Sequence, residues 1–213
     1  KKINFDQVID PEFYENQNTK NNSDTTHFSV IDASGNIVSA TLSINTSFGA
    51  LFVPEGTGIF MNNHLDDFSF ENESNTYGLI GSHFNYLKPF KRPLSSMTPT
   101  VLEDENSIIV IGTPGGSRII SMVAQYLAHY LFFPDLSLEK IINIPHIHHQ
   151  YYPNKVFIEK SFNEKSALML LKKGHIIKKL NYNWGSLQIV HYRKNDGKIF
   201  VINDPRTQKG RIF

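Results

Sequence analysis

The sequence predicts an α+β protein with antiparallel sheets. Strand patterns dominate residues 25–44, helical spacing dominates residues 117–144, and strand patterns return in residues 187–202. Strands and helices that are grouped rather than alternating are typical of this class. The chain has 213 residues, of which 40% are hydrophobic and 19% charged. This composition is that of a folded chain long enough to bury a core.

Composition also excludes several kinds of chemistry. Lys plus Arg is 21 and Asp plus Glu is 20, a net charge of +1, which argues against a nucleic-acid surface or a polybasic membrane surface. Apolar runs are too short for a membrane-spanning helix. Without cysteine, disulfides, thiolate catalysis and Cys-ligated zinc are ruled out. The chain starts Lys1-Lys2 without an initiator Met, so we expect it to be a piece of something longer.

The first 24 residues differ from the rest. Residues 15–24 (ENQNTKNNSD) are almost wholly polar and rich in Asn, without helical or strand periodicity, and we interpret them as a solvated loop or tail.

A β-hairpin follows. Residues 25–31 and 37–44 flank the turn residues DASGN, and the even positions from 38 to 44 are apolar. We expect this apolar face to be buried. A turn centred on Ser34 places Thr25 opposite Ser43, with Asn45 further along the same face. A register shift of one residue would remove this pairing, and strand hydroxyls are also common as ordinary surface groups.

The remaining elements follow in order. We expect a short strand near 58–61, an irregular segment over 68–90, a Pro-bounded turn region over 91–100 and a buried strand over 107–111. Apolar spacing predicts a helix over 117–131, and a short helix over 137–144 ends at Pro145. A capping box at 161–164 opens a helix that stops at Gly174. Strands resume after Leu187, around the turn 194–197.

Three further groups could carry chemistry. Gly115 and Gly116 precede a predicted helix, where backbone amides can bind an anion or an oxyanion, although a plain strand-to-helix turn has the same pattern. The polar stretch 62–67 (NNHLDD) could bind a metal or an ammonium group, or be a solvated loop. Residues 146–149 hold three His, but adjacent His148 and His149 cannot point the same way, so packing or a solvated loop is favoured over zinc.

Four segments together resemble the γ-glutamyltransferase (γ-glutamyl transpeptidase) family of N-terminal-nucleophile hydrolases. They are 25–30 (TTHFSV), 62–68 (NNHLDDF), 91–100 (KRPLSSMTPT) and 112–118 (GTPGGSR). The likeness covers residues 25–213 and corresponds to the small, catalytic subunit. It implies a four-layer αββα sandwich of antiparallel sheets, partial without the large subunit. Residues 1–24 would be the C-terminal remnant of that large subunit, with the precursor cleaved between Asp24 and Thr25.

The resemblance also implies roles for individual residues. Thr25 would be the nucleophile, and its α-amine, freed by cleavage and with an ordinary pKa of roughly 7.7–8.0, would be its base. Ser43 matches a hydroxyl that contacts the nucleophile. Gly115 and Gly116 match the oxyanion hole.

For substrate binding, the resemblance implies that Asn45 and Asp67 hold the glutamyl α-amino group. Ser95 and Ser96 would bind the α-carboxylate, and Tyr77 would belong to a lid. His64 stands where the family usually has Gln or Glu; a protonated imidazole would repel the substrate ammonium, so we expect weaker binding in acid.

The expected activity is therefore acyl transfer from glutathione or another γ-glutamyl compound, through a γ-glutamyl ester on Thr25, to water or to an amino-acid or dipeptide acceptor. The resemblance implies a large-subunit partner, a periplasmic or secreted location, and neither cofactor nor metal. The alternatives are a related acylase (poly-γ-glutamate depolymerase or cephalosporin acylase) and an unprocessed, non-catalytic binding module. His146 replaces a usual Arg, and the sequence gives no functional account of that change.

Overall fold

The computed structural model describes residues 25–71, 73–81, 83–151 and 153–206. Within them lie a two-stranded sheet, a four-stranded sheet and a three-stranded sheet. The expected boundary at residue 24, including Asp24, lies outside the described residues. In the described part of the chain, no helix is both long and apolar enough to cross a bilayer.

The two-stranded sheet is the predicted hairpin of β1 (Thr25–Ile31) and β2 (Ile37–Ser43). Its antiparallel register pairs Thr25 with Ser43, which confirms the prediction. The turn is closed by Asp32, whose Oδ1 accepts hydrogen bonds of 2.8 Å from the backbone amides of Ser34 and Asn36. Ser43, the last residue of β2, therefore lies beside Thr25, the first residue of β1.

The prediction that the apolar face of the hairpin is buried is wrong for this chain. Phe28, Val30, Val38 and Leu42 are 44%, 43%, 46% and 58% exposed, respectively. The opposite, polar face packs on the four-stranded sheet, with β1 against β4 and β8 and β2 against β4. The alternation of apolar and polar residues correctly separated the two faces of the hairpin. It could not tell which face packs against the rest of this chain.

Polar contacts therefore join the hairpin to the sheet. His27 lies between Thr41 Oγ1 at 2.8 Å and Ser29 Oγ at 3.0 Å, and Ser29 Oγ donates to the carbonyl of Gln188 at 3.2 Å. Burial lowers the pKa of His27 to about 4, so the ring is neutral. The layers meet closely at Gly112, where an added Cβ would lie 2.2 Å from the His27 ring.

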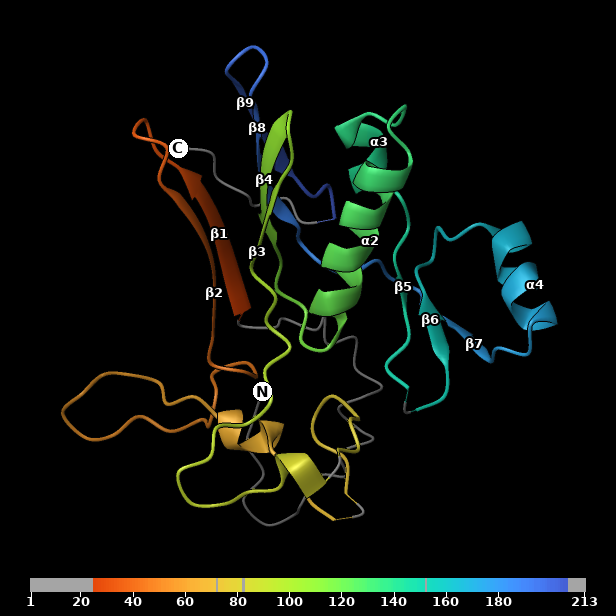
Figure 1. Cartoon of the computed structure of the whole chain (residues 1–213). Coiled ribbons are helices and arrows are strands. Elements are labelled where there is room, and N and C mark those ends of the chain that lie inside the picture. Colours follow the sequence, from red (N-terminus) through yellow and green to blue (C-terminus); the bar gives the residue numbers. More distant parts are fainter. Residues whose placement is uncertain (1–24, 72, 82, 152, 207–213) are drawn as a thin grey trace.

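The four-stranded sheet is antiparallel, in the order β3 (Thr100–Glu103), β4 (Ser107–Gly112), β8 (Gln188–Arg193) and β9 (Lys198–Asn203). Helix α2 (Arg118–Phe132) lies on the side away from the hairpin, beside α3 (Leu138–Ile142) (Figure 1). The core between helix and sheet includes Ile109, Ile111, Ile119, Met122, Val123, Leu187 and Ile189. The described residues thus stack in three layers: helix, sheet and hairpin.

The third sheet contains β5 (Ile147–His148), β6 (Val156–Ile158) and β7 (Ile177–Lys179). The pair β6–β7 is parallel, an exception to the predicted antiparallel sheets, because α4 (Glu164–Lys172) connects the two strands. The capping box expected to start α4 at Ser161 is wrong by two residues. The N-cap is Asn163, whose side chain accepts a 3.0 Å hydrogen bond from the Ser166 amide.

The segment between the hairpin and β3 is mostly irregular, with two short 3-10 helices, η1 (His64–Asp67) and η2 (His83–Asn85). The strand expected near 58–61 is not formed. Instead, two backbone hydrogen bonds join Met61 to Ala50 and Phe52 across a loop.

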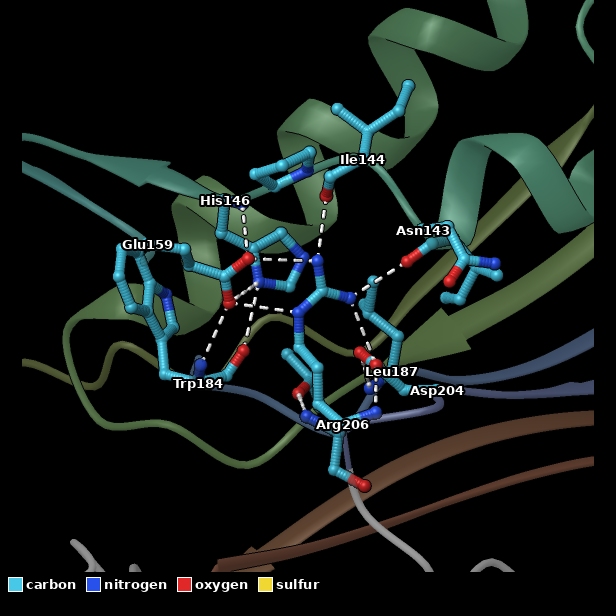
Figure 2. A network of polar contacts seen from close by, with 12 residues as sticks. Asn143, Ile144, His146, Glu159, Trp184, Leu187, Asp204 and Arg206 are labelled. Carbon is cyan, nitrogen blue, oxygen red and sulfur yellow. Dashed lines mark hydrogen bonds and ion pairs between the residues drawn. The ribbon is translucent and has the colours of Figure 1, made fainter. Parts of the chain in front are cut away.

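A buried ion network surrounds Arg206 (Figure 2). Arg206 donates to Glu159 at 2.9 and 3.0 Å and to Asp204 at 3.0 Å, and both carboxylates are fully buried. Glu159 also accepts from the backbone amides of His146 and Trp184, each at 2.8 Å. Arg206 thus joins the segment after β9 to the residue that follows β6, and Glu159 extends the network to the segment that precedes β8.

Candidate active site

The predicted site residues meet in one pocket that is open to solvent. It lies where the open end of the hairpin, η1 and the start of α2 come together. All of the predicted site residues in the described chain line it except Gly115. The lining residues are Thr25, Ser43, Asn45, His64, Asp67, Tyr77, Ser95, Ser96, Met97, Gly116 and Ile119.

Two hydroxyls face each other at the base of this pocket. The buried Thr25 has its Oγ1 2.8 Å from Ser43 Oγ. The Ser43 oxygen also accepts a 2.9 Å hydrogen bond from the backbone amide of Asn45. Ser43 can therefore donate its own proton to Thr25 Oγ1, and that contact would stabilise negative charge developing on the threonine oxygen.

Asn45 and Tyr77 form a second wall. Asn45 has a φ of +77°, a conformation that Asn tolerates better than most residues. The Tyr77 hydroxyl donates to Asn45 Oδ1 at 2.7 Å, and its ring covers Gly116, where an added Cβ would lie 2.4 Å from a ring carbon. Burial, with help from the Asp67 and Asp66 charges, raises the pKa of Tyr77 to about 12, so its hydroxyl stays a donor.

His64 bridges Ser43 and Asp67. His64 Nε2 lies 3.1 Å from the carbonyl oxygen of Ser43, and Nδ1 lies 2.7 Å from Asp67 Oδ2. A carbonyl only accepts, so Nε2 is the donor in the contact with Ser43. Burial raises the pKa of Asp67, and the contact with His64 partly opposes this. Both His64 nitrogens thus have partners within the chain.

Asn85, which the sequence reasoning did not single out, joins two parts of the pocket wall. Its Nδ2 donates to the carbonyl of Asp67 at 2.8 Å, and its Oδ1 accepts from the amide of Leu94 at 3.0 Å. Leu94 directly precedes Ser95 and Ser96. Asn85 therefore fixes the distance between the Asp67 backbone and the two serines.

The two glycines of the loop before α2 have different surroundings. Gly116 has a φ of +57° and lines the pocket, whereas Gly115 has a φ of +146°. An added Cβ on Gly115 would lie 2.6 Å from Met122 Cε in the core. Thr113 supports the loop, because its buried hydroxyl donates to the Pro114 carbonyl and accepts from the Ser186 amide. The strand-to-helix turn is thus tightly built, with Gly116 at the surface of the pocket.

His146 and His148, which lie near α2, do not line the pocket. His146 Nδ1 contacts the Trp184 carbonyl at 2.9 Å, and His148 Nδ1 contacts Ser121 Oγ at 2.7 Å. Both rings are buried, so the prediction of hydrogen-bonded packing is confirmed for these two residues. Within the described ranges, no three His, Asp or Glu residues are placed to hold a metal ion. Met97 and Ile119 also line the pocket. Met97 lies in the segment 91–100 that carries the resemblance, but neither residue was given a role from the sequence.

Comparison with known proteins agrees with this architecture. The family model for gamma-glutamyltranspeptidase matches residues 1–213. The chain is 40% identical over 185 residues to the glutathione hydrolase proenzyme of Escherichia coli, covering 86% of this chain and 31% of that protein. A Helicobacter pylori gamma-glutamyltranspeptidase structure superposes with a TM-score of 0.79 at 35% identity, covering 85% of this chain and all of the other.

The fold is therefore that of an N-terminal-nucleophile hydrolase, of which the described residues form three layers. The chain belongs to the gamma-glutamyltranspeptidase family. It spans about a third of the length of the curated relatives that it matches, 31% of one and 33% of another. These relatives are proenzymes with longer precursors, which is consistent with a further subunit as partner.

Proposed function

We propose that this chain supplies the catalytic subunit of an enzyme that transfers or hydrolyses γ-glutamyl groups. The observation that carries the proposal is the Thr25–Ser43 hydroxyl pair at 2.8 Å in the base of the pocket. Cleavage between Asp24 and Thr25 would turn the Thr25 nitrogen from an amide into an amine. That amine can remove the proton from Thr25 Oγ1, so that nucleophile and base belong to one residue.

The acyl-transfer step follows from this arrangement. Thr25 Oγ1 attacks the γ-carbonyl carbon of glutathione or another γ-glutamyl compound, and its proton passes to the Thr25 amine. The C–N bond then breaks, the amine returns the proton to the leaving nitrogen, and a γ-glutamyl ester remains on Thr25. Water, an amino acid or a dipeptide resolves this ester. The backbone amides around Gly115 and Gly116 are the proposed donors to the oxyanion.

The walls of the pocket suit a free α-amino-acid head group. Asp67 supplies a carboxylate for the α-ammonium, with the Asn45 side chain nearby, and the hydroxyls of Ser95 and Ser96 suit the α-carboxylate. His64 contacts Asp67 on one side and Ser43 on the other. We propose that His64 acts on the ammonium through Asp67 rather than by direct contact.

The alternatives predict other results. A transpeptidase enzyme of Bacillus anthracis, CapD, superposes with a TM-score of 0.64 at 29% identity, both lower than the 0.79 and 35% of the Helicobacter pylori gamma-glutamyltranspeptidase. A non-catalytic module would keep the bond between Asp24 and Thr25 intact. We further propose a large subunit cut from the same precursor as partner, and a periplasmic or secreted location, which fractionation of the source cells would test.

The direct test uses the full-length precursor. Incubation should yield a fragment whose mass starts at Thr25, and the processed enzyme should release the aniline from a γ-glutamyl anilide. Rapid quenching and peptide mass spectrometry should find a γ-glutamyl adduct on the peptide that begins with Thr25. Stimulation by a dipeptide distinguishes transfer from hydrolysis. A precursor that stays intact, or an adduct on another residue, would refute the proposal.

Donor binding should weaken as the pH falls. Asp67 must be ionised to attract the ammonium, and because burial raises its pKa, it takes up a proton at a higher pH than an ordinary Asp does. The KM for the donor should therefore rise as the pH is lowered. The rise should begin at a pH above the range in which an ordinary Asp takes up its proton. Asp67→Asn should have a high KM that no longer depends on pH in this way. A KM for the unaltered enzyme that stays flat across the range would contradict the assignment.

Asn85→Ala should weaken donor binding although Asn85 is not among the pocket-lining residues. The substitution removes both hydrogen bonds that fix the Asp67 backbone against Leu94. The loss of about two neutral hydrogen bonds is worth roughly 1–3 kcal/mol, which we expect mainly as a higher KM. Asn106→Ala, at the turn before β4, is a matched control that should leave KM unchanged. Equal KM values for both variants would show that Asn85 does not position the head-group site.

A further inference from the structure

Residues 75–79 form a compact loop, here called the cover loop. Asn75 closes it, because Asn75 Oδ1 accepts from the amides of Tyr77 and Leu79, each at 3.0 Å, and its carbonyl accepts from Gly78 at 2.8 Å. The loop is thus held together internally. Its position over the pocket depends on contacts to other elements, of which Tyr77 to Asn45 is one.

A second contact comes from Gln150, just after β5. Gln150 Nε2 donates to the carbonyl of Tyr77 at 3.0 Å, and Gln150 Oε1 accepts from Ser117 Oγ at 2.8 Å. Ser117 directly follows Gly116 and precedes the first residue of α2, and its side chain makes no capping hydrogen bond to the helix. One amide side chain therefore joins the cover loop to the glycine loop that also lines the pocket.

Gln150 is itself held in a fixed orientation. Its Oε1 lies 2.9 Å from His148 Nε2, and His148 Nδ1 lies 2.7 Å from Ser121 Oγ on α2. An amide oxygen only accepts, so Nε2 of His148 carries the hydrogen, and the neutral ring accepts from Ser121 at Nδ1. Burial lowers the pKa of His148, which favours this neutral form. The amide of Gln150 can therefore be oriented only with its nitrogen toward Tyr77.

We propose that Gln150 is a positioning residue that latches the cover loop shut and holds it in register with the Gly116 loop. The expected effect on KM rests on the proposed function. The position of the cover loop does not depend on that function. Tyr77 packs on Gly116, where there is no room for a side chain. A shift of either loop would therefore move both Tyr77 and Gly116, and Gly116 belongs to the loop whose amides are proposed to face the substrate carbonyl.

Three variants separate the two halves of the latch. Gln150→Ala removes both contacts. Gln150→Glu keeps an acceptor for Ser117 and His148 but sets a carboxylate oxygen against the Tyr77 carbonyl, so it breaks the cover-loop contact alone. Ser117→Ala breaks the α2 contact alone. Gln125→Ala is the control. Gln125 likewise joins α2 to the start of β5, through the Pro145 carbonyl and the Ile147 amide, and it does not line the pocket.

The experiment is hydrogen–deuterium exchange on the processed full-length enzyme, together with donor kinetics. Exchange of peptides covering 75–79 should rise roughly 2- to 10-fold in Gln150→Ala, the size expected for one neutral hydrogen bond, and further in Gln150→Glu. Ser117→Ala should raise exchange at 115–119 more than at 75–79. The donor KM should rise in the same order as exchange at 75–79, with a smaller change in kcat.

Unchanged exchange at 75–79 in both Gln150 variants, or an equal rise in Gln125→Ala, would overturn the latch. An unaltered enzyme that releases no aniline would instead overturn the proposed function, and the exchange comparison would still decide on the latch.

Discussion

Thr25→Ala should abolish both self-cleavage and turnover. The substitution removes the proposed nucleophilic oxygen and leaves Ser43 Oγ without its 2.8 Å partner. Loss of a nucleophile that acts together with its base typically costs on the order of 10⁴-fold or more in kcat. Intact mass should show one unbroken precursor, and aniline release should fall to background. The fold should survive, because the change removes one hydroxyl and one methyl group.

Two variants make this result specific. Thr25→Ser keeps both a hydroxyl and, after cleavage, an α-amine, so it should be processed more slowly and retain measurable turnover. Ser43→Ala keeps the nucleophile but removes its hydrogen-bonding partner, so it should lie between the unaltered enzyme and Thr25→Ala. A Thr25→Ala protein that is still cleaved at residue 24, or still active, would exclude Thr25 as the nucleophile.

Arg206→Met should cause the largest loss of stability. Arg206 is the shared cation between Glu159 and Asp204, and it also donates to the carbonyls of Ile142 and Ile144. Removing it leaves two buried carboxylates facing an apolar side chain. Breaking a buried ion pair from one side costs about 3–5 kcal/mol, to be measured as a shift of the urea unfolding midpoint of the full-length enzyme.

The pH dependence of stability gives a second readout of this network. Burial pushes the pKa of Glu159 up, but hydrogen bonds from His146 and Arg206 outweigh it and hold the pKa at about 2. Because this lies below the unfolded value of about 4.5, Glu159 contributes full stability above pH 4.5 and loses it as the pH falls toward 2. In Arg206→Met, the pKa of Glu159 should rise and this acid-sensitive contribution should shrink.

An exposed ion pair provides the control. Arg193 and Asp196 pair at the turn between β8 and β9, where both side chains are well exposed. Arg193→Met should therefore shift the midpoint far less than Arg206→Met does. Similar midpoints for the two variants would show that the buried network does not stabilise the fold as its geometry indicates.

Local patterns predicted the hairpin and α2 well. Turn residues and alternation were enough to place Thr25 opposite Ser43, because a hairpin's register is set within a few residues. The side that packs was mispredicted, since burial of Phe28 or Leu42 depends on elements beyond the hairpin. The pairing of β6 with β7 was missed for the same reason: it depends on how α4 folds back between two three-residue strands.

In the candidate site too, the sequence predicted some residues and missed others. Residues with distinctive chemistry, such as Asp67 and the two serines, could be chosen from motifs that resemble a known family, and the pocket brings them together. Asn85 and Gln150 could not be chosen, because an amide side chain in a loop carries no signal of what it holds. Their importance comes from the two partners that each one joins, and those partners are distant in sequence.

The close approach of Gly112 to His27 limits how this chain can be engineered. His27 lies two residues from Thr25 on β1, so the spacing between hairpin and sheet sets where Thr25 lies. Position 112 does not line the pocket, yet any side chain there would have to displace His27 and, with it, Thr25. Variant libraries that seek new donors should therefore diversify Met97, which lines the pocket, and keep position 112 as glycine.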